Sequence, residues 1–139
     1  MKDNGRIEIS KSSIDTLSEL FLEKSRLNQF YDKNVFFTQN LKGFKYNQFQ
    51  VIGNLGGHPT DTEFSTDTDF YIISDLIVED LRRGLKNEQL TELENKINSK
   101  GKKHTKLKIL TEKVFLRYVY ERCSSINDQV TLNLIRELI

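Results

Sequence analysis

The sequence contains a single cysteine, Cys123, so the chain cannot form a disulfide within itself. It also lacks any apolar run of about 18 residues, the length that a membrane-spanning helix requires. Residues 1–10 are polar and do not resemble the apolar stretch of a secretion signal. An unpaired thiol is typical of a reducing compartment. We therefore expect a cytoplasmic protein with no membrane partner.

No charge of one sign dominates the chain. Lysine and arginine number 21, aspartate and glutamate 20, and the formal net charge is +1. Bulk charge therefore cannot attract nucleic acid, and any such binding requires a local basic patch. The chain has 139 residues, of which 37% are hydrophobic, enough for a folded core and too many for a disordered chain.

Several motifs of catalytic and cofactor sites are missing. The glycines at 53, 56 and 57 end a predicted helix instead of preceding one, so they do not form a phosphate loop. The two histidines, His58 and His104, lie in different elements and have no ligand spacing with Cys123. We therefore expect no catalytic residue, no metal site and no cofactor.

An acidic segment in the middle of the chain leaves one alternative open. Its carboxylates are Asp61, Glu63, Asp67, Asp69, Asp75, Glu79 and Asp80. Clustered carboxylates can hold Mg²⁺ for nuclease chemistry. The competing interpretation is that Asp67 and Asp69 fix a turn before a strand.

Hydrophobic periodicity predicts alternating helices and strands. Helices are predicted over 13–28, 44–55, 85–97, 111–122 and 124–139, and strands over 33–38, 58–64, 67–74 and 106–110. Pro59 favours a sheet edge for the second strand, and Thr111 is a predicted helix cap. Residues 75–84 fit either a turn of helix or a packed loop. Strands separated by helices favour an α/β fold, with a parallel sheet covered on both faces.

Segments of four of these elements resemble the motifs of bacterial BRCT domains, in the same order. They read FYDKNVFFT (30–38), NLGG (54–57), STDTDFYII (65–73) and KILTEKVFLRYV (108–119). The nearest variants are the modules attached to epsilon-type proofreading exonucleases and NAD-dependent DNA ligases. The resemblance implies a four-stranded parallel sheet flanked by three helices over 30–122. Residues 1–29 would then be an extension with one helix, and 123–139 a C-terminal amphipathic helix.

The resemblance also implies a non-catalytic function in DNA replication or repair. Modules of this family bind protein partners, phosphorylated peptides or DNA ends. Their phosphate pocket uses a Ser or Thr after the first strand, the amide of a following glycine, and a lysine near the second helix. Thr38 matches the first group, but Gln39 replaces the glycine. Gln89 stands at the aligned lysine position, with Lys86 only nearby. Thr38, Gln39 and Lys86 are therefore an incomplete phosphate site.

A lysine-rich segment is the second candidate site. Lys100, Lys102, Lys103 and Lys106 are close together in KGKKHTKLK. Flexible lysines contact DNA phosphates without reading sequence, although such segments are more commonly only solvated. A further alternative is structural: the terminal helices would form a homodimer, with the pocket degenerate.

Overall fold

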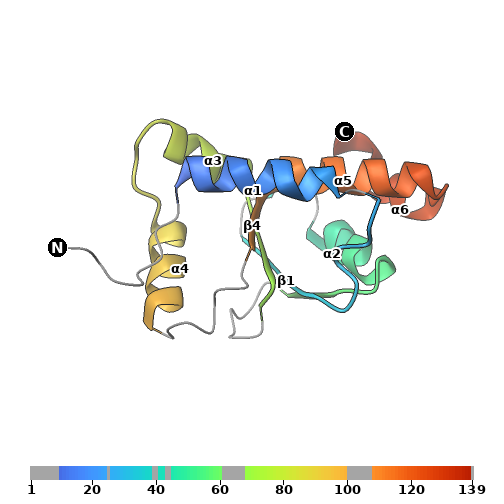
Figure 1. Ribbon diagram of the computed structural model, residues 1–139, viewed down its shortest axis with the longest axis horizontal. Helices are drawn as coiled ribbons and strands as arrows, with labels where there is room; N and C mark the ends of the chain where they lie inside the picture. Colours follow the sequence, from blue (N-terminus) through green and yellow to red (C-terminus); the bar gives the residue numbers. More distant parts are fainter. Residues whose placement is uncertain are drawn as a thin grey trace.

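The computed structural model describes residues 10–24, 26–38, 41–42, 45–60, 68–99 and 108–138 (Figure 1). The helices are α1 (Lys11–Glu23), α2 (Lys45–Asn54), α3 (Asp75–Arg82), α4 (Glu88–Ser99), α5 (Glu112–Ser125) and α6 (Gln129–Ile135), followed by the 3-10 turn η2 (Arg136–Leu138). The strands are β1 (Asn34–Phe37), β2 (His58–Thr60), β3 (Phe70–Ile73) and β4 (Lys108–Thr111). The predicted α/β class is confirmed. The segment that sequence left open, 75–84, contains the helix α3.

All four strands are parallel and lie in the order β2-β1-β3-β4. The central strand β3 is buried at every residue, as its uninterrupted apolar sequence FYII indicates. Strand β2 lies at one edge of the sheet, as the presence of Pro59 predicted. The His58 amide donates to the Lys33 carbonyl at 2.8 Å, so the Pro59 nitrogen points away from β1 and withholds no bond from the sheet.

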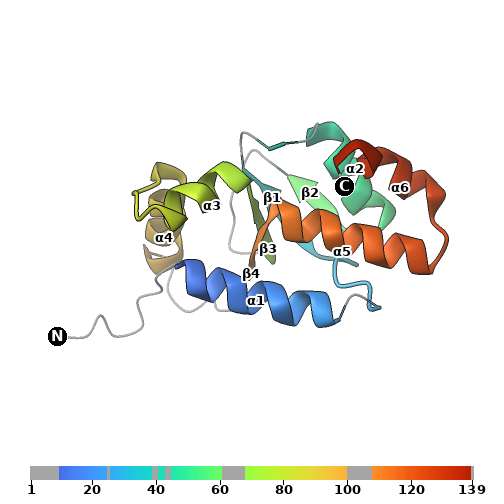
Figure 2. The ribbon, with the colours of Figure 1, turned by 90° about the horizontal axis from the view of Figure 1, so that it is seen from above.

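The two faces of the sheet bury two separate cores. Figure 2 shows the helices that lie on either side of the strands. On one face, α2 and α5 pack against Val35, Phe37, Ile72 and their neighbours. On the other face, α3 and α4 cover Tyr71 and Ile73. Successive side chains of a strand point to opposite faces, so β1, β3 and β4 each supply residues to both cores.

Helix α1 lies beside β4, along the second edge of the sheet (Figure 2). Its Ile14 joins the α3–α4 core, and its Phe21 joins the α2–α5 core. The helix therefore connects the two cores and covers a strand edge that would otherwise expose unpaired backbone groups.

Helix α1 ends earlier than the predicted residue 28, and a side chain explains where. Gln29 Nε2 donates to the carbonyl of Phe21 at 2.8 Å and to that of Lys24 at 3.2 Å. The last carbonyls of the helix thus obtain a partner outside it. The following turn is held by the buried Tyr118, whose hydroxyl donates to the Leu27 carbonyl and accepts from the Gln29 amide.

The predicted C-terminal helix over 124–139 is shorter in the structure, because 124–125 belong to α5 and α6 is followed by the turn η2. Helix α5 continues to Ser125, and Asn127 then adopts a left-handed φ of 57°. Asp128 caps α6, because its Oδ1 accepts from the Thr131 amide at 3.1 Å. Leu132 and Ile135 are the apolar side chains of α6 that are buried against α2 and α5, whereas Val130 of the predicted apolar stripe is 72% exposed. Among the described residues, no helix is both long and apolar enough to cross a bilayer.

Candidate functional site

Polar side chains gather where β1, β3 and β4 end. Because the strands are parallel, these carboxyl ends share one edge of the sheet. The chain passes from β1 outward to β2 and then returns to β3 on the other side of β1. In open α/β sheets, such a reversal of strand order marks the usual place of a binding crevice.

Thr38 and Ser74 meet at this reversal. Thr38 Oγ1 accepts a hydrogen bond from the Ser74 amide at 3.0 Å, and Thr38 is only 2% exposed. Ser74 occupies the residue before α3 with an extended backbone, and its buried Oγ has no hydrogen-bond partner among the described residues. The Thr38 hydroxyl therefore joins two strand ends inside the protein.

Glu112 is the most unusual residue at this edge, because it is a fully buried carboxylate. Its Oε1 accepts from the Lys42 amide at 2.7 Å, and its Oε2 accepts from Gln48 Nε2 at 2.8 Å. It also begins α5, where a negative charge favours the helix. Glu112 thereby connects the segment after β1, helix α2 and helix α5. Thr111 caps the same helix as predicted, accepting from the Val114 amide at 3.1 Å.

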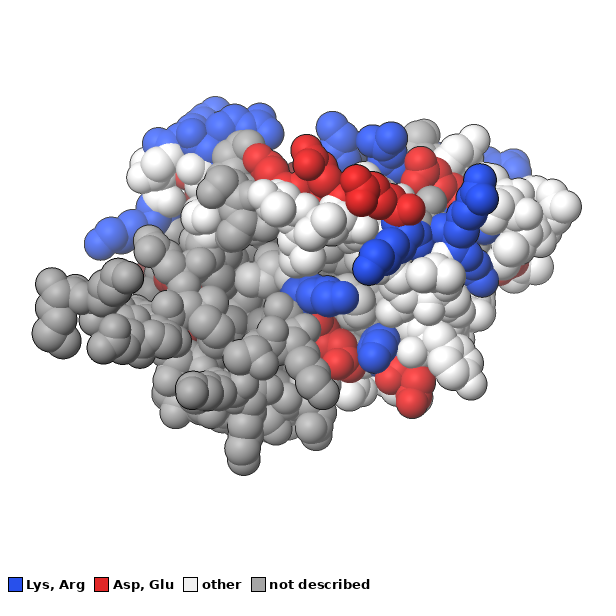
Figure 3. All heavy atoms as spheres, in the orientation of Figure 1, with Lys and Arg blue, Asp and Glu red and all other residues white. Residues whose placement is uncertain are grey.

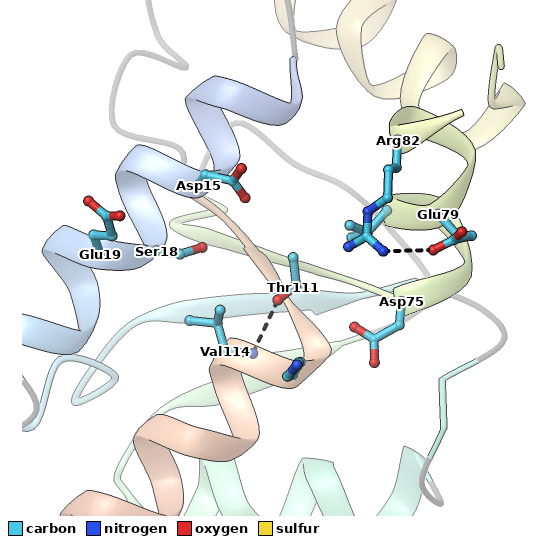
Figure 4. A pocket seen from close by; sticks show the side chains of 10 residues that line it. Asp15, Ser18, Glu19, Asp75, Glu79, Arg82, Thr111 and Val114 are labelled. Atoms are coloured by element: carbon cyan, nitrogen blue, oxygen red, sulfur yellow. Dashed lines mark hydrogen bonds and ion pairs between the residues drawn. The ribbon is translucent and has the colours of Figure 1, made fainter. Parts of the chain in front are cut away.

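A pocket of about 550 Å³ lies between α1, α3 and the start of α5. Figure 3 shows acidic side chains in a row over α1, and Figure 4 shows some of them around the pocket. The lining residues are Asp15, Ser18, Glu19, Asp75, Val78, Glu79, Arg82, Thr111, Lys113 and Val114. Glu79 pairs with Arg82 at 3.2 Å. Carboxylates outnumber cations in the lining, so the pocket disfavours a phosphate group.

The two described members of the predicted phosphate site lie at opposite ends of α3. Thr38 contacts Ser74 at the amino end of α3, whereas Lys86 follows the far end of that helix. The eight residues of α3 between them span about 12 Å. Gln39 and the four predicted DNA-binding lysines, at 100, 102, 103 and 106, lie outside the described residues.

The described acidic residues have separate structural contacts. Asp69 Oδ2 accepts from the Asn34 amide at 2.9 Å, joining the starts of β3 and β1. Asp75 follows the same strand at its opposite end, about 20 Å away for six extended residues. Asp80 Oδ2 accepts from Asn87 Nδ2 at 2.9 Å. Asp61, Glu63 and Asp67 are outside the described residues, and the residues that are described contain no cluster able to hold a metal ion.

The described histidine and cysteine lie in different surroundings. His58 Nε2 lies 3.1 Å from Asp32 Oδ1, and both side chains are exposed. Cys123 is fully buried, and burial raises the pKa of its thiol to about 11. At neutral pH the thiol is therefore protonated, which is the unreactive form.

No protein-family model matches the chain, and no curated protein sequence matches it either.

Sequence reasoning identified Thr38 after the first strand and Thr111 as a helix cap, but it missed the burial of Glu112 and the hydrogen bond that Glu112 accepts from Gln48. An acidic residue next to a helix cap normally faces solvent, so the local pattern carried no sign of the burial.

Proposed function

We propose that the chain is a non-catalytic binding module of the BRCT type, which docks a protein partner or DNA in replication or repair. One observation carries this proposal. The described parts of the four family-like segments lie, in chain order, in β1, at the end of α2, in β3, and in β4 with α5, and the three strands belong to one parallel sheet. Residues within them also fill positions where the fold needs their particular chemistry.

The NLGG segment is the clearest case. Gly56 has a left-handed φ of 83°, which favours glycine. A Cβ on Gly57 would lie 2.7 Å from the Phe30 carbonyl oxygen, so a side chain there would collide with backbone. Phe30, from the first segment, is itself fully buried. The two segments thus depend on each other at the end of α2.

The polar groups at the carboxyl edge favour binding over catalysis. Thr38, Glu112 and Thr111 bond to other groups of the protein and thereby fix the loops and helices around the edge. Of the described carboxylates of the acidic segment, Asp69 precedes β3, whereas Asp75, Glu79 and Asp80 belong to α3, and these described residues form no cluster able to hold a metal ion. An edge whose polar groups already bond within the protein suits docking to a partner's surface.

We propose DNA contact through Lys100, Lys102, Lys103 and Lys106. The other candidate, the phosphate site, is incomplete, and its Thr38 lies inside the protein. Lysines that neutralise phosphates release counterions, so binding through them weakens steeply with salt. A gel-shift or fluorescence-anisotropy titration of a labelled duplex with the purified chain tests this. We expect binding at about 50 mM salt and much weaker binding at about 200 mM.

Replacing Lys102 and Lys103 together by alanine should weaken DNA binding and lower the salt slope by about 2. The matched control replaces Lys24 and Lys33, both of which are exposed in the structure, and should change binding much less. Absence of binding by the native chain at low salt would exclude the DNA interaction. Cleavage of the duplex in Mg²⁺ would instead support the nuclease alternative.

A further inference from the structure

Helices α2 and α6 lie side by side, on the side of the molecule opposite α1 (Figure 2). Asn47 Nδ2 donates to the Leu134 carbonyl at 3.4 Å, and Asn54 Nδ2 donates to Thr131 Oγ1 at 3.1 Å. Since the later α2 residue meets the earlier α6 residue, the two helices are antiparallel. Their outward sides therefore form one continuous surface.

The described outward side chains of these two helices include no charged residue. None occurs in 46–57 or in 129–135, although charged residues make up 29% of the chain; the charged residues next to these ranges are Lys45 before the first, and Asp128 and Arg136 on either side of the second. The exposed side chains of this surface are Tyr46, Gln50, Asn54, Gln129, Val130 and Asn133, and we call this set the uncharged face. The neighbouring Asp128 uses both carboxylate oxygens to bond Thr131 within the protein.

The uncharged face also exposes two large apolar side chains. Tyr46 is 71% exposed and Val130 is 72% exposed. Depletion of charge together with exposed aromatic and aliphatic groups distinguishes the centre of a protein interface from ordinary surface. The same depletion excludes DNA as an occupant, because DNA binding requires cations.

We propose that the uncharged face associates with the same face of a second copy of this chain. A two-fold interface places each surface against itself, so a charged residue near the axis meets a like charge. Amide side chains avoid this problem, because each carries both a donor and an acceptor. The uncharged face is therefore complementary to itself in a way that the acidic surface over α1 is not. This inference does not rest on the proposed function.

The size of the face sets the strength of the association. Helices of ten residues are about 15 Å long, and two neighbouring helices with their side chains are about 20 Å wide. The projected area is then about 300 Å², below the roughly 800 Å² per partner of stable complexes. The dimer should accordingly be weak and in equilibrium with the monomer.

Analytical ultracentrifugation of the purified chain from about 10 to about 500 μM tests the proposal. We expect the average mass to rise from monomer toward dimer. We also expect little change between about 50 and about 500 mM NaCl, because no charges meet. A constant monomer mass over the whole range would overturn the proposal, as would an association that salt abolishes.

Val130→Glu provides the sharper test, since it introduces a charge into the uncharged face of both copies. We expect association to weaken at least about tenfold. Val130 lies in the first turn of α6, where a glutamate favours the helix, so the variant should fold; a thermal melt checks this. The matched control is Leu76→Glu, which makes a similar change at an apolar side chain of α3 that is 64% exposed. Equal losses in both variants would indicate non-specific association and would also overturn the proposal.

Discussion

At the scale of residues, burial decides what each polar group does. Glu112 and Thr38 are polar, and both are buried with partners that come from distant segments. A buried polar group costs free energy when its partner is lost, because water cannot replace the missing bond. These residues are therefore more sensitive to substitution than the exposed carboxylates of the same chain.

Glu112→Ala should lower the free energy of unfolding by about 3 kcal/mol. The substitution removes two hydrogen bonds to a carboxylate and leaves the Gln48 amide buried without its acceptor. Urea denaturation followed by circular dichroism measures the change. The neighbouring exposed Lys113→Ala should alter stability by less than about 0.5 kcal/mol. Equal stability of both variants would show that the buried bonds contribute nothing.

At the scale of elements, two glycines near the end of α2 differ in whether the surrounding structure leaves room for a side chain. Gly53 is in the helix, and nothing lies within 4 Å of a Cβ built on it. Gly57, after the helix, is enclosed by the Ile52 side chain and the Phe30 carbonyl. The same residue type is therefore dispensable at one position and required at the other.

Two alanine substitutions should separate these roles. Gly53→Ala should raise stability by about 0.5–1 kcal/mol, because alanine restricts the unfolded chain and favours the helix. Gly57→Ala should lower stability by about 1–3 kcal/mol, because the new methyl group displaces packed atoms. Thermal melts of both variants measure the difference. Stabilisation by Gly57→Ala would contradict the close approach to Phe30.

At the scale of the whole molecule, α1 joins the two cores across the edge of β4. Phe21 packs its ring against Phe30, Phe70 and Tyr118, with ring centroids 4.6 to 5.6 Å apart. The helix thus contributes packing energy and also prevents another strand from pairing with β4.

Phe21→Ala should cost about 3–5 kcal/mol of stability. It should also increase aggregation, since loss of α1 packing uncovers the edge of β4. Denaturation and light scattering measure the two effects. The adjacent Leu20→Ala removes a side chain that is 52% exposed and should change neither by much. Comparable effects of the two variants would mean that α1 does not depend on its buried face.

Sequence by itself determined the α/β class, the edge position of Pro59, the glycine end of α2 and the Thr111 cap. Each of these depends on residues adjacent in the chain, whose spacing and backbone preferences are local properties. Only the tertiary structure decided that Glu112 is buried, that Lys86 is separated from Thr38 by α3, and that Leu132 and Ile135 are the apolar side chains of α6 buried against the body. Burial and contact depend on which distant segments fold together, and no local pattern in α5 or α6 records the position of α2.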